Sequence, residues 1–425
     1  MRTRLLLPAV LAATVLATAA CGGSSGGTGD GAGKPAASGA APGAPAGTGS
    51  LTVWADDARA KPLQEIAAAF TRDKGVKVKV VQKGLGEIRD DFVSQAPTGQ
   101  GPDVVVGPHD WLGKLVHNGV LAPLELGDRA AAFSPVALDA MRYEGRTYGL
   151  PYAVDGIALL RNTELAPQAP ASFDELLSTG RRLVAEGKAK LPVAVPVDAK
   201  SGSPYHLYPL QTSFGCQVFG TKPDGGYDAN RLELDSPACQ RFAPWLRGLG
   251  RDGVLSTSLT AEIATDAFLK GQTPYLLAGP WDAATFRNAH VPFAVDPVPS
   301  ADGSPARPFV GVQGFFVGAK SANPILAQDF VLNYLSTPQA QRALYDTGGR
   351  VPATTAVLDQ VKDDPVVAGF ARAAQAGVPT PNLPAMDSVW ADWGLTQLAI
   401  VQGRGEPAEL TTAMASRIRA KIAAG

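Results

Sequence analysis

Long hydrophobic runs are scarce in this 425-residue chain, and the one that stands out lies at its N-terminus. Beyond it, no segment is apolar over the roughly 20 residues that a transmembrane helix needs, which excludes later membrane spans. An excess of one charge is also lacking, because 38 Lys and Arg residues balance 39 Asp and Glu residues and are dispersed along the chain. We therefore expect no nucleic acid partner.

Sequence motifs for nucleotides and metals are missing too. The chain has no Walker-type loop and no metal-binding or catalytic-nucleophile motif. We expect neither a cofactor nor a bound metal.

The N-terminal hydrophobic run has the layout of an export signal. Two arginines precede apolar residues 5–20, and this run of about 16 residues is shorter than a membrane span. It ends in Ala-Ala-Cys21 followed by glycines, which resembles a bacterial lipoprotein signal that is cleaved before Cys21 and acylated on its thiol. Thr18 departs from the Leu, Val or Ile usual in that motif. The alternative is an ordinary secretory signal with a chance cysteine.

Residues 22–50 consist almost entirely of Gly, Ala, Ser, Thr and Pro. Such a segment cannot bury enough surface to order itself. We predict a signal peptide over residues 1–20 and a lipid-anchored flexible linker over residues 21–50, with an end-to-end span of about 30 Å. The remainder would then be held at the extracellular face of the cell membrane.

The rest of the chain alternates strand-like and helix-like segments, which predicts an α/β fold. Its length exceeds what one hydrophobic core usually fills, so two lobes are expected. The predicted strands are 51–54, 76–81, 104–106, 157–160, 275–278 and 309–317. The predicted helices are 63–70, 88–95, 261–270, 325–335 and 390–401.

Only three cysteines are present, and Cys216 and Cys239 remain if Cys21 is lipidated. In an exported protein such a pair favours a disulfide, against the alternative of two buried thiols. The segment between them is rich in Gly, Pro and Asp, which predicts a hairpin-like excursion followed by a helix from Ala238.

One short stretch, "GPDVVVGPHDWLG", leads from a buried strand directly into polar chemistry. His109 beside Asp110 is consistent with half of an acid/base pair. Asp110 beside Trp111 is equally consistent with a sugar-binding site. The stretch alone leaves both interpretations open.

An ordered set of segments separates them: "LTVWADDARAKPLQEIAAAFTRDKGVKVKVV", "GPDVVVGPHDWLGKLVHNGVLAPL", "YGLPYAVDGIALLRNTEL", "AEIATDAFLKGQTPYLLAGPW", "PFVGVQGFFVGAKSANP" and "PNLPAMDSVW". In this order they resemble the maltose and maltodextrin-binding proteins, the extracellular solute receptors of ABC sugar importers. The resemblance covers nearly all of residues 51–425.

This resemblance implies a two-lobed periplasmic-binding-protein-like fold with the ligand cleft between the lobes and the crossovers as a hinge. One lobe would comprise residues 51–153 and 312–360, and the other residues 154–311 and 361–425. The implied partners are an oligosaccharide, the transmembrane subunits of an ABC permease and, through the N-terminal lipid, the membrane. A monomer is expected.

Sugar rings present a rim of hydroxyl groups and flat faces of C–H groups, so a sugar site combines carboxylates with aromatic rings. The charged cleft positions implied by the resemblance are Asp110, Asp155, Asp56 or Asp57, and Arg59 or Lys61. The aromatic ones are Tyr205, Trp281 and Trp390. For each acid alone, a helix N-cap or a solvated loop is the ordinary alternative, and for each Trp it is core packing.

The departures from the family pattern concern the same region. Gly107 stands where the family often has a third Trp, and Trp111 stands where it has an Arg. Ser203 replaces an acid, and Gly394 replaces an Arg, with Trp393 alongside. Aromatic surface is moved rather than lost, so we include Trp111 and Trp393 in the predicted site. Two charged hydroxyl-binding positions are gone, so the ligand stays open among maltose, a different glucan, a cyclic or branched oligosaccharide and another glycoside.

Three functions remain in competition. A non-catalytic receptor fits the ordered family segments and the predicted lipid tether, and His109 would then shape the turn that aims Asp110. A cell-surface glycoside hydrolase would need a second carboxylate or nucleophile facing Asp110. A sugar-binding adhesion lipoprotein would not need a hinged architecture. The receptor, which is not an enzyme, is the prediction.

Overall fold

The structure of the chain is a computed structural model that describes residues 49–223 and 226–424, all within one compact unit. The predicted signal peptide, Cys21 and nearly all of the predicted linker lie outside the described residues. Within the described part of the chain, no helix is both long enough and apolar enough to cross a membrane.

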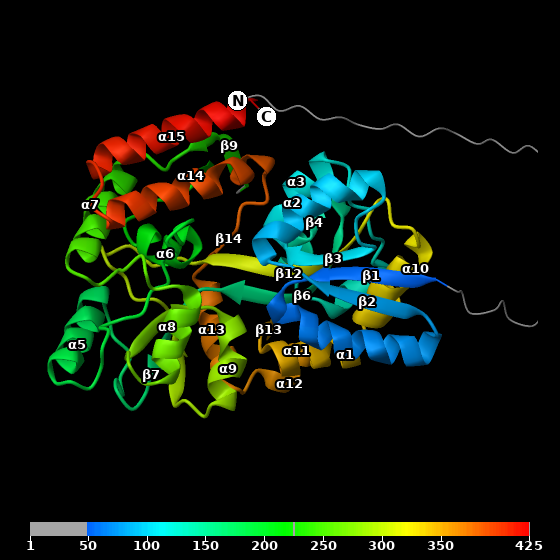
Figure 1. The fold of residues 1–425 in the computed structure, drawn as a ribbon, viewed down its shortest axis with the longest axis horizontal. Helices are drawn as coiled ribbons and strands as arrows, with labels where there is room; N and C mark the ends of the chain where they lie inside the picture. Colours follow the sequence, from blue (N-terminus) through cyan, green and yellow to red (C-terminus); the bar gives the residue numbers. More distant parts are fainter. Residues whose placement is uncertain (1–48, 224–225, 425) are drawn as a thin grey trace, which may run out of the picture. The chain divides into compact units, whose positions relative to one another are not determined.

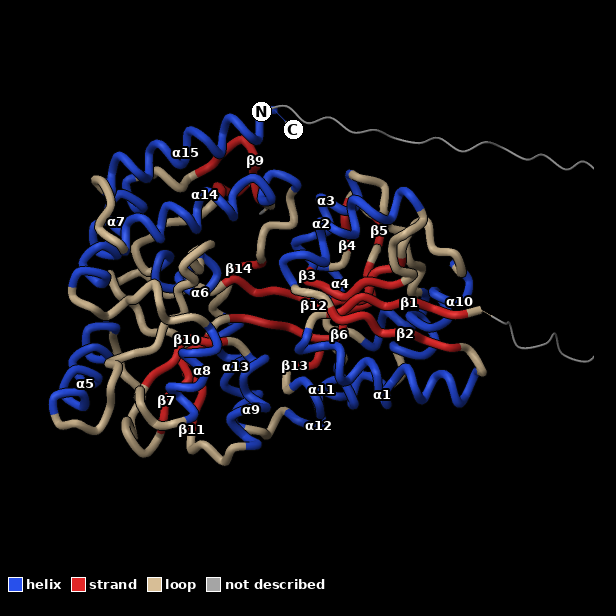
Figure 2. Tube along the Cα trace, in the orientation of Figure 1, coloured by secondary structure: helices blue, strands red, loops and turns tan. Residues whose placement is uncertain are grey.

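The larger β-sheet has the strand order β13-β6-β12-β3-β1-β2, with β14 beside β12 (Figure 2). Its strands are β1 (Ser50–Ala55), β2 (Lys77–Gln82), β3 (Val104–Pro108), β6 (Gly149–Gly156), β12 (Phe309–Val317), β13 (Val351–Pro352) and β14 (Val378–Pro379). Strand β1 runs parallel to β2 and β3, and β12 runs antiparallel to β3 and β6. The carboxyl ends of β1 and β3 therefore lie at the same edge of the sheet.

A smaller sheet has the order β10-β7-β11, with β7 antiparallel to both neighbours. Its strands are β7 (Ala158–Asn162), β10 (Tyr275–Ala278) and β11 (Phe293–Asp296). Two antiparallel pairs complete the strands, namely β4 (Arg142–Tyr143) with β5 (Arg146–Thr147) and β8 (Phe219–Thr221) with β9 (Tyr227–Leu232).

Helices cover both sheets, which makes the fold α/β (Figure 1). Those up to β8 are α1 (Asp57–Lys74), α2 (Leu85–Gln95), α3 (Leu112–His117), α4 (Pro135–Ala140), α5 (Phe173–Ala185) and α6 (Pro204–Thr212). Those between β9 and β12 are α7 (Pro237–Arg251), α8 (Ala261–Leu269) and α9 (Ala283–Asn288). The later ones are α10 (Pro324–Asp329), α11 (Pro338–Gly348), α12 (Thr355–Val361), α13 (Pro365–Gln375), α14 (Pro384–Val401) and α15 (Pro407–Ala424).

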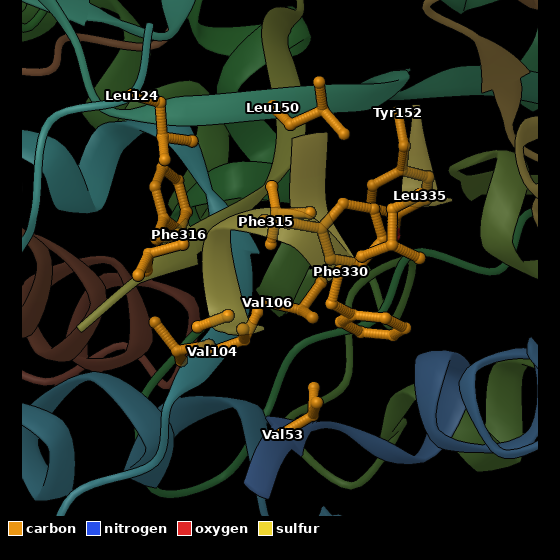
Figure 3. Packing of buried hydrophobic residues seen from close by; sticks show 14 of the residues in the cluster. Val53, Val104, Val106, Leu124, Leu150, Tyr152, Phe315, Phe316, Phe330 and Leu335 are labelled. Carbon is orange, nitrogen blue, oxygen red and sulfur yellow. The ribbon is translucent and has the colours of Figure 1, made fainter. Parts of the chain in front are cut away.

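Strand β12 is at the centre of the largest hydrophobic cluster. All of its residues are buried, and Gln313 is its single polar side chain. Figure 3 shows Phe315 and Phe316 on neighbouring positions of this strand, packed among side chains of β3, β6 and the helices around them. A strand buried on both faces reads as one continuous apolar run, which is why 309–317 is predicted without error.

Among the described residues, buried hydrophobic side chains form four clusters, two of which outline the two lobes; a third joins residues 158–295 to residues 345–373 across the predicted lobe boundary. The largest cluster takes its residues from 51–153 and 312–353, whereas another takes them from 157–306 and 398–401. Strands β6 and β12 pair along their whole length and carry the chain from one set to the other (Figure 1).

Helix boundaries differ from the predicted ones where capping residues decide them. Helix α1 extends to Asp57–Lys74 because the Asp56 side chain accepts from the Arg59 N–H and Gly75 ends the helix at φ 70°. Helix α14 begins at Pro384 rather than at Trp390, since proline fits the first helical position. Trp390 therefore lies well inside the helix, which corrects the prediction that the helix starts at this residue.

The predicted disulfide is confirmed. Cys216 and Cys239 are bonded, with their Cα atoms 4.7 Å apart, and both are buried. The intervening chain forms the β8–β9 pair, and α7 follows from Pro237, as the prediction of a hairpin-like excursion and a helix required.

Candidate functional site

A cavity of about 810 Å³, called the main cavity below, lies where loops from both sheets meet. Its acidic lining residues are Asp56, Asp57, Asp110, Asp155 and Asp282. Its basic lining residues are Arg59, Arg89, His206 and Arg350. Its aromatic lining residues are Trp111, Tyr205, Trp281 and Trp390. The cavity thus combines hydrogen-bond acceptors with flat apolar surfaces.

The first cavity segment, residues 107–111, follows β3 of the larger sheet. A 3-10 turn over His109–Trp111 bends the chain, so that Asp110 and Trp111 both line the cavity. The indole of Trp111 lies against Gly107, where a Cβ atom would overlap the ring. The glycine that replaces a family tryptophan thus makes room for the tryptophan four residues later.

His109 holds this segment in place rather than facing the cavity. Its ring is buried, Nδ1 accepts from the Val312 backbone N–H at 3.0 Å, and Nε2 lies 3.1 Å from the Thr380 carbonyl oxygen. Because Nδ1 is an acceptor, the proton belongs on Nε2, which donates to Thr380. Burial lowers the pKa of His109 to about 4, so the ring stays neutral. With both nitrogens occupied, it is poorly suited to proton transfer.

Asp110 lines the cavity, and its carboxylate accepts a hydrogen bond from its own backbone N–H. Across the described residues, no side chain donates a hydrogen bond to its carboxylate, and the expected alternative role as a helix cap is not observed, since α3 has no side-chain cap. Burial raises the pKa of Asp110 to about 6, while the nearby Arg89 guanidinium opposes that shift. Its oxygens therefore remain available to donors from outside the protein.

The second cavity segment, residues 279–283, follows β10 of the smaller sheet. Its 3-10 turn, Pro280–Asp282, places Trp281 and Asp282 in the cavity lining. The Trp281 indole lies against Gly279, which again has no space for a Cβ atom. Burial raises the pKa of Asp282 to about 6, and the hydrogen bond that it accepts from Thr265 Oγ1 is long, at 3.4 Å.

Helix α6 adds two rings to the same region. The Tyr205 ring centroid lies 6.3 Å from that of Trp281, and the His206 ring lies 6.2 Å from it. Burial lowers the pKa of His206 to about 4. These contacts extend the aromatic surface beyond the Trp281 indole.

The two tryptophans of α14 have different environments. Trp390 lines the main cavity and is partly buried. Trp393 is 1% exposed and does not line it; its indole N–H donates to Gln211 Oε1 at 3.1 Å. The two rings stack with centroids 5.7 Å apart, so Trp393 supports Trp390 from the core side.

The start of α1 shows how Asp56 and Asp57 differ. Asp56 is 4% exposed; its Oδ1 accepts from the Arg59 backbone N–H at 3.1 Å and its Oδ2 from Arg59 Nη1 at 2.6 Å. Asp57 is exposed at the cavity rim. Arg59 also donates to the Tyr152 hydroxyl and to Gln313, so it is fixed from three directions.

Asp155 forms a buried ion pair that the sequence does not reveal. Its Oδ2 accepts from Arg350 Nη1, and the Arg350 guanidinium lies 5.6 Å from the Trp281 ring centroid. Within the described residues, Asp155 Oδ1 is buried and lacks a hydrogen-bond partner. A buried acceptor of this kind is costly unless a ligand or water satisfies it.

A neighbouring cavity of about 610 Å³ is more polar and less suited to ring stacking. Lys61, Glu65 and Arg287 line it, and Tyr345 is its aromatic residue. Lys61 thus belongs to this neighbouring cavity, whereas Arg59 lines the main one. Among the described residues, no cluster of His, Cys, Asp or Glu is arranged to hold a metal ion.

The main cavity brings together nine of the eleven site residues named from the sequence and leaves out Trp393 and Lys61. Sequence reasoning missed Asp282, Arg350, Gln313 and His206. Gln313 had a usable signal, because it is a lone polar residue in an apolar strand. Asp282 also had a signal in the sequence, because "GPWD" at residues 279–282 is similar to "GPHD" at residues 107–110. Arg350 had no signal in the sequence. It lies beside Asp155 only because β13, which follows it, pairs with β6.

The fold is two-lobed and α/β, and the main cavity is lined by acids and indoles from elements of both lobes. This arrangement is typical of a ligand-binding protein. Residues 65–369 match the family described as bacterial extracellular solute-binding proteins. The chain belongs to this family, as the sequence resemblance indicated.

Curated relatives of the chain carry names that agree with this family. A galactooligosaccharide-binding protein of Bacillus subtilis is 25% identical, over 88% of this chain and 90% of its own. A maltotriose-binding protein of Pyrococcus abyssi is 26% identical, over 81% of this chain and 76% of its own. A maltooligosaccharide ABC transporter solute-binding lipoprotein of Streptococcus pneumoniae is 26% identical, over 80% of this chain and 81% of its own.

Proposed function

We propose that this protein is the lipid-anchored, oligosaccharide-binding subunit of an ABC importer, which captures its ligand by hinge closure and delivers it to a membrane permease. The observation that carries the proposal is the main cavity, where Asp110, Asp155 and Asp282 lie among the indoles of Trp111, Trp281 and Trp390. Ionised carboxylates accept hydrogen bonds from pairs of hydroxyl groups, and indoles cover the apolar faces of sugar rings.

The relatives narrow the ligand class without naming the ligand. Their names refer to galactooligosaccharides, maltotriose and maltooligosaccharides, all of them neutral oligosaccharides. Identities near 25% leave the sugar itself open. The proposal is therefore a neutral oligosaccharide of glucose or galactose units, with linear, branched and cyclic forms as the candidates.

Hinge closure is supported by the two-lobed fold. We assign residues 51–153 and 312–360 to one lobe and residues 154–311 and 361–425 to the other, with the β6–β12 pair as part of the hinge. Strand pairing along β6 and β12 shifts register between Gln313 and Gly314, at the point where the chain leaves the first lobe. A ligand that contacts both lobes favours the closed form only through its higher affinity for that form.

An acid/base pair of His109 and Asp110, one form that a glycoside hydrolase site could take, is disfavoured by the state of His109. Its two ring nitrogens are held by Val312 and Thr380, and its lowered pKa keeps it neutral. The family and its curated relatives consist of binding proteins. We infer that the cavity binds a sugar without cleaving it.

Titration calorimetry tests the function directly. The panel consists of maltotriose, maltotetraose, cyclomaltohexaose, a branched glucan oligosaccharide and a galactotriose. We expect one of them to bind with micromolar or tighter affinity and to be recovered intact after a day with the protein. Steady release of shorter sugars would refute the receptor function, and failure of the whole panel to bind would refute the ligand class.

Small-angle scattering tests the closure. The radius of gyration of residues 49–425 is expected to fall on addition of the sugar that binds. An unchanged radius at saturation would contradict hinge closure while leaving sugar binding intact.

Lipid anchoring has its own test, because Cys21 lies outside the described residues. Expression of the full chain and of Cys21→Ser in a bacterial host compares their partition between membrane and medium. We expect the variant to be released and the parent to stay with the membrane. Equal partition would indicate an ordinary secretory signal.

A further inference from the structure

The two cavity segments share a local design that the sequence separates by more than a hundred residues. In each, Gly-Pro stands at the end of a buried strand, as the last two residues of β3 in one case and directly after β10 in the other. A 3-10 turn then leads into a short helix, α3 or α9. In each, an aspartate stands three positions after the glycine, Asp110 after Gly107 and Asp282 after Gly279.

The indoles of both segments rest on these glycines in the same manner. A Cβ atom on Gly107 would meet Cζ3, Cε3 and Cη2 of Trp111. A Cβ atom on Gly279 would meet the same three atoms of Trp281. Each segment therefore fixes one indole at the main cavity by packing the same edge of the ring onto bare backbone.

Both carboxylates keep unused acceptor capacity. Asp110 has no side-chain donor among the described residues, and Asp282 accepts the long contact from Thr265 Oγ1 and a side-chain hydrogen bond from Trp281. The groups that face Asp110 are Arg89 and Asp387, and those that face Asp282 are Thr265, Trp281 and Arg350. In neither case does a cation form an ion pair with the carboxylate.

We propose that Asp282 is a second sugar-binding carboxylate, equivalent to Asp110, so that the cavity holds two neighbouring units of the oligosaccharide on two matched pairs of indole and carboxylate. The proposal rests on the proposed function and goes further by assigning Asp282 and a repeated mode of recognition. An oligosaccharide repeats one chemical unit, and two like pairs suit such a repeat. In each pair the indole covers a ring face and the carboxylate accepts from hydroxyl groups at the ring edge.

Calorimetry on three matched asparagine variants tests the assignment. Asp282→Asn and Asp110→Asn keep the size of the side chain but remove its charge. Asp266→Asn on α8 is the control, because that exposed carboxylate is paired with Lys270 at 2.7 Å and does not line the main cavity. We expect the first two variants to bind the same panel sugar roughly tenfold to a hundredfold more weakly, the range for hydrogen bonds to charged groups. The control should bind within twofold of the parent.

Proton release provides a readout that a purely structural role would not change. Hydroxyl donors stabilise the ionised carboxylate, so binding lowers its pKa and releases protons near pH 6. Titrations in buffers of different ionisation enthalpy count those protons, and Asp282→Asn is expected to release fewer than the parent. Thermal melts check that each variant is folded.

The outcomes distinguish a failure of the Asp282 assignment from a failure of the proposed function. If the parent binds a panel sugar and Asp282→Asn binds it within twofold with unchanged proton release, the assignment of Asp282 is wrong and the receptor function stands. If the parent binds no panel sugar, the proposed function fails and this inference fails with it.

Discussion

The two cavity segments differ most at the position two residues after their shared glycine. In the first segment that residue is His109, buried and bonded to β12 and to Thr380; in the second it is Trp281, which lines the cavity. The first segment therefore uses this position to fix itself to the sheet and supplies its indole two residues later, from Trp111. The corresponding position therefore serves anchoring in one segment and lines the cavity in the other.

The largest effect is expected where an indole serves the core instead of the cavity. Trp393→Ala should reduce the free energy of unfolding by about 3–5 kcal/mol, as other large core truncations do. Trp390→Ala should instead weaken sugar binding tenfold to several-hundredfold, through lost stacking and lost apolar burial. Denaturant unfolding and calorimetry on both variants measure the contrast. A Trp390→Ala protein that is strongly destabilised but binds normally would assign Trp390 to the core as well.

Substitution of His109 and Trp281 tests the difference between the segments. His109→Phe leaves the Val312 N–H and the Thr380 carbonyl buried without partners, each at a cost of about 1–3 kcal/mol, so stability should fall by about 2–6 kcal/mol. Trp281→Ala should reduce affinity with a smaller change in stability, because its ring is partly exposed to the cavity. Urea unfolding and sugar titration of each variant check this. Equal stability losses would remove the distinction between anchor and contact.

Alanine at the shared glycines tests the similarity. Gly107→Ala and Gly279→Ala place a methyl group where each indole lies, which should displace the ring and weaken binding at least tenfold, with a stability cost of about 1–3 kcal/mol. Gly248→Ala in α7 is the control, since its Cβ atom would meet open space and alanine favours a helix by up to about 1 kcal/mol. A large loss for one cavity glycine alone would show that the segments are not equivalent.

The smallest effect concerns the two aspartates in the absence of sugar. Their pKa values are raised to about 6 in the folded protein, above the value of about 4 for a free carboxyl group. The folded state therefore binds more protons between pH 4 and 6, and stability falls as pH rises through that interval. Asp110→Asn or Asp282→Asn should each raise the free energy of unfolding at pH 7.5 by about 1–3 kcal/mol, and the gain should vanish below about pH 4. A gain that is independent of pH would contradict the raised pKa values.

Much of the fold follows from local patterns. The apolar run 309–317 and the run 275–278 coincide with β12 and β10, because strands buried on both faces need no alternation. Strand β6 was missed, since Gly, Pro and Asp within Gly149–Gly156 weaken the strand pattern. Its place is set by pairing with β12 over the length of the strand, which is a long-range contact.

Some residues of the candidate site could likewise be predicted from the sequence, and others could not. Asp110, Trp111, Trp281 and Trp390 follow strand ends and breakers in segments that resemble a known family, so their place at a cavity could be predicted. Arg350 could not, because it follows the αL residue Gly349 in a segment with no local sign of a ligand site. Nor could the different environments of Trp390 and Trp393, which depend on which face of α14 meets Gln211 and the core.

The sequence by itself determined that the chain is α/β, that Cys216 and Cys239 pair, and that acids and indoles follow strand ends, because these features depend on patterning and on residues close in the chain. Tertiary structure alone decided that His109 ties its segment to β12 and that Arg350 neutralises Asp155. It also decided that two Gly-Pro segments more than a hundred residues apart face one cavity. The reason is physical: a hydrogen bond or an ion pair depends on distances in space, and these are fixed only when both sheets and their crossovers have packed.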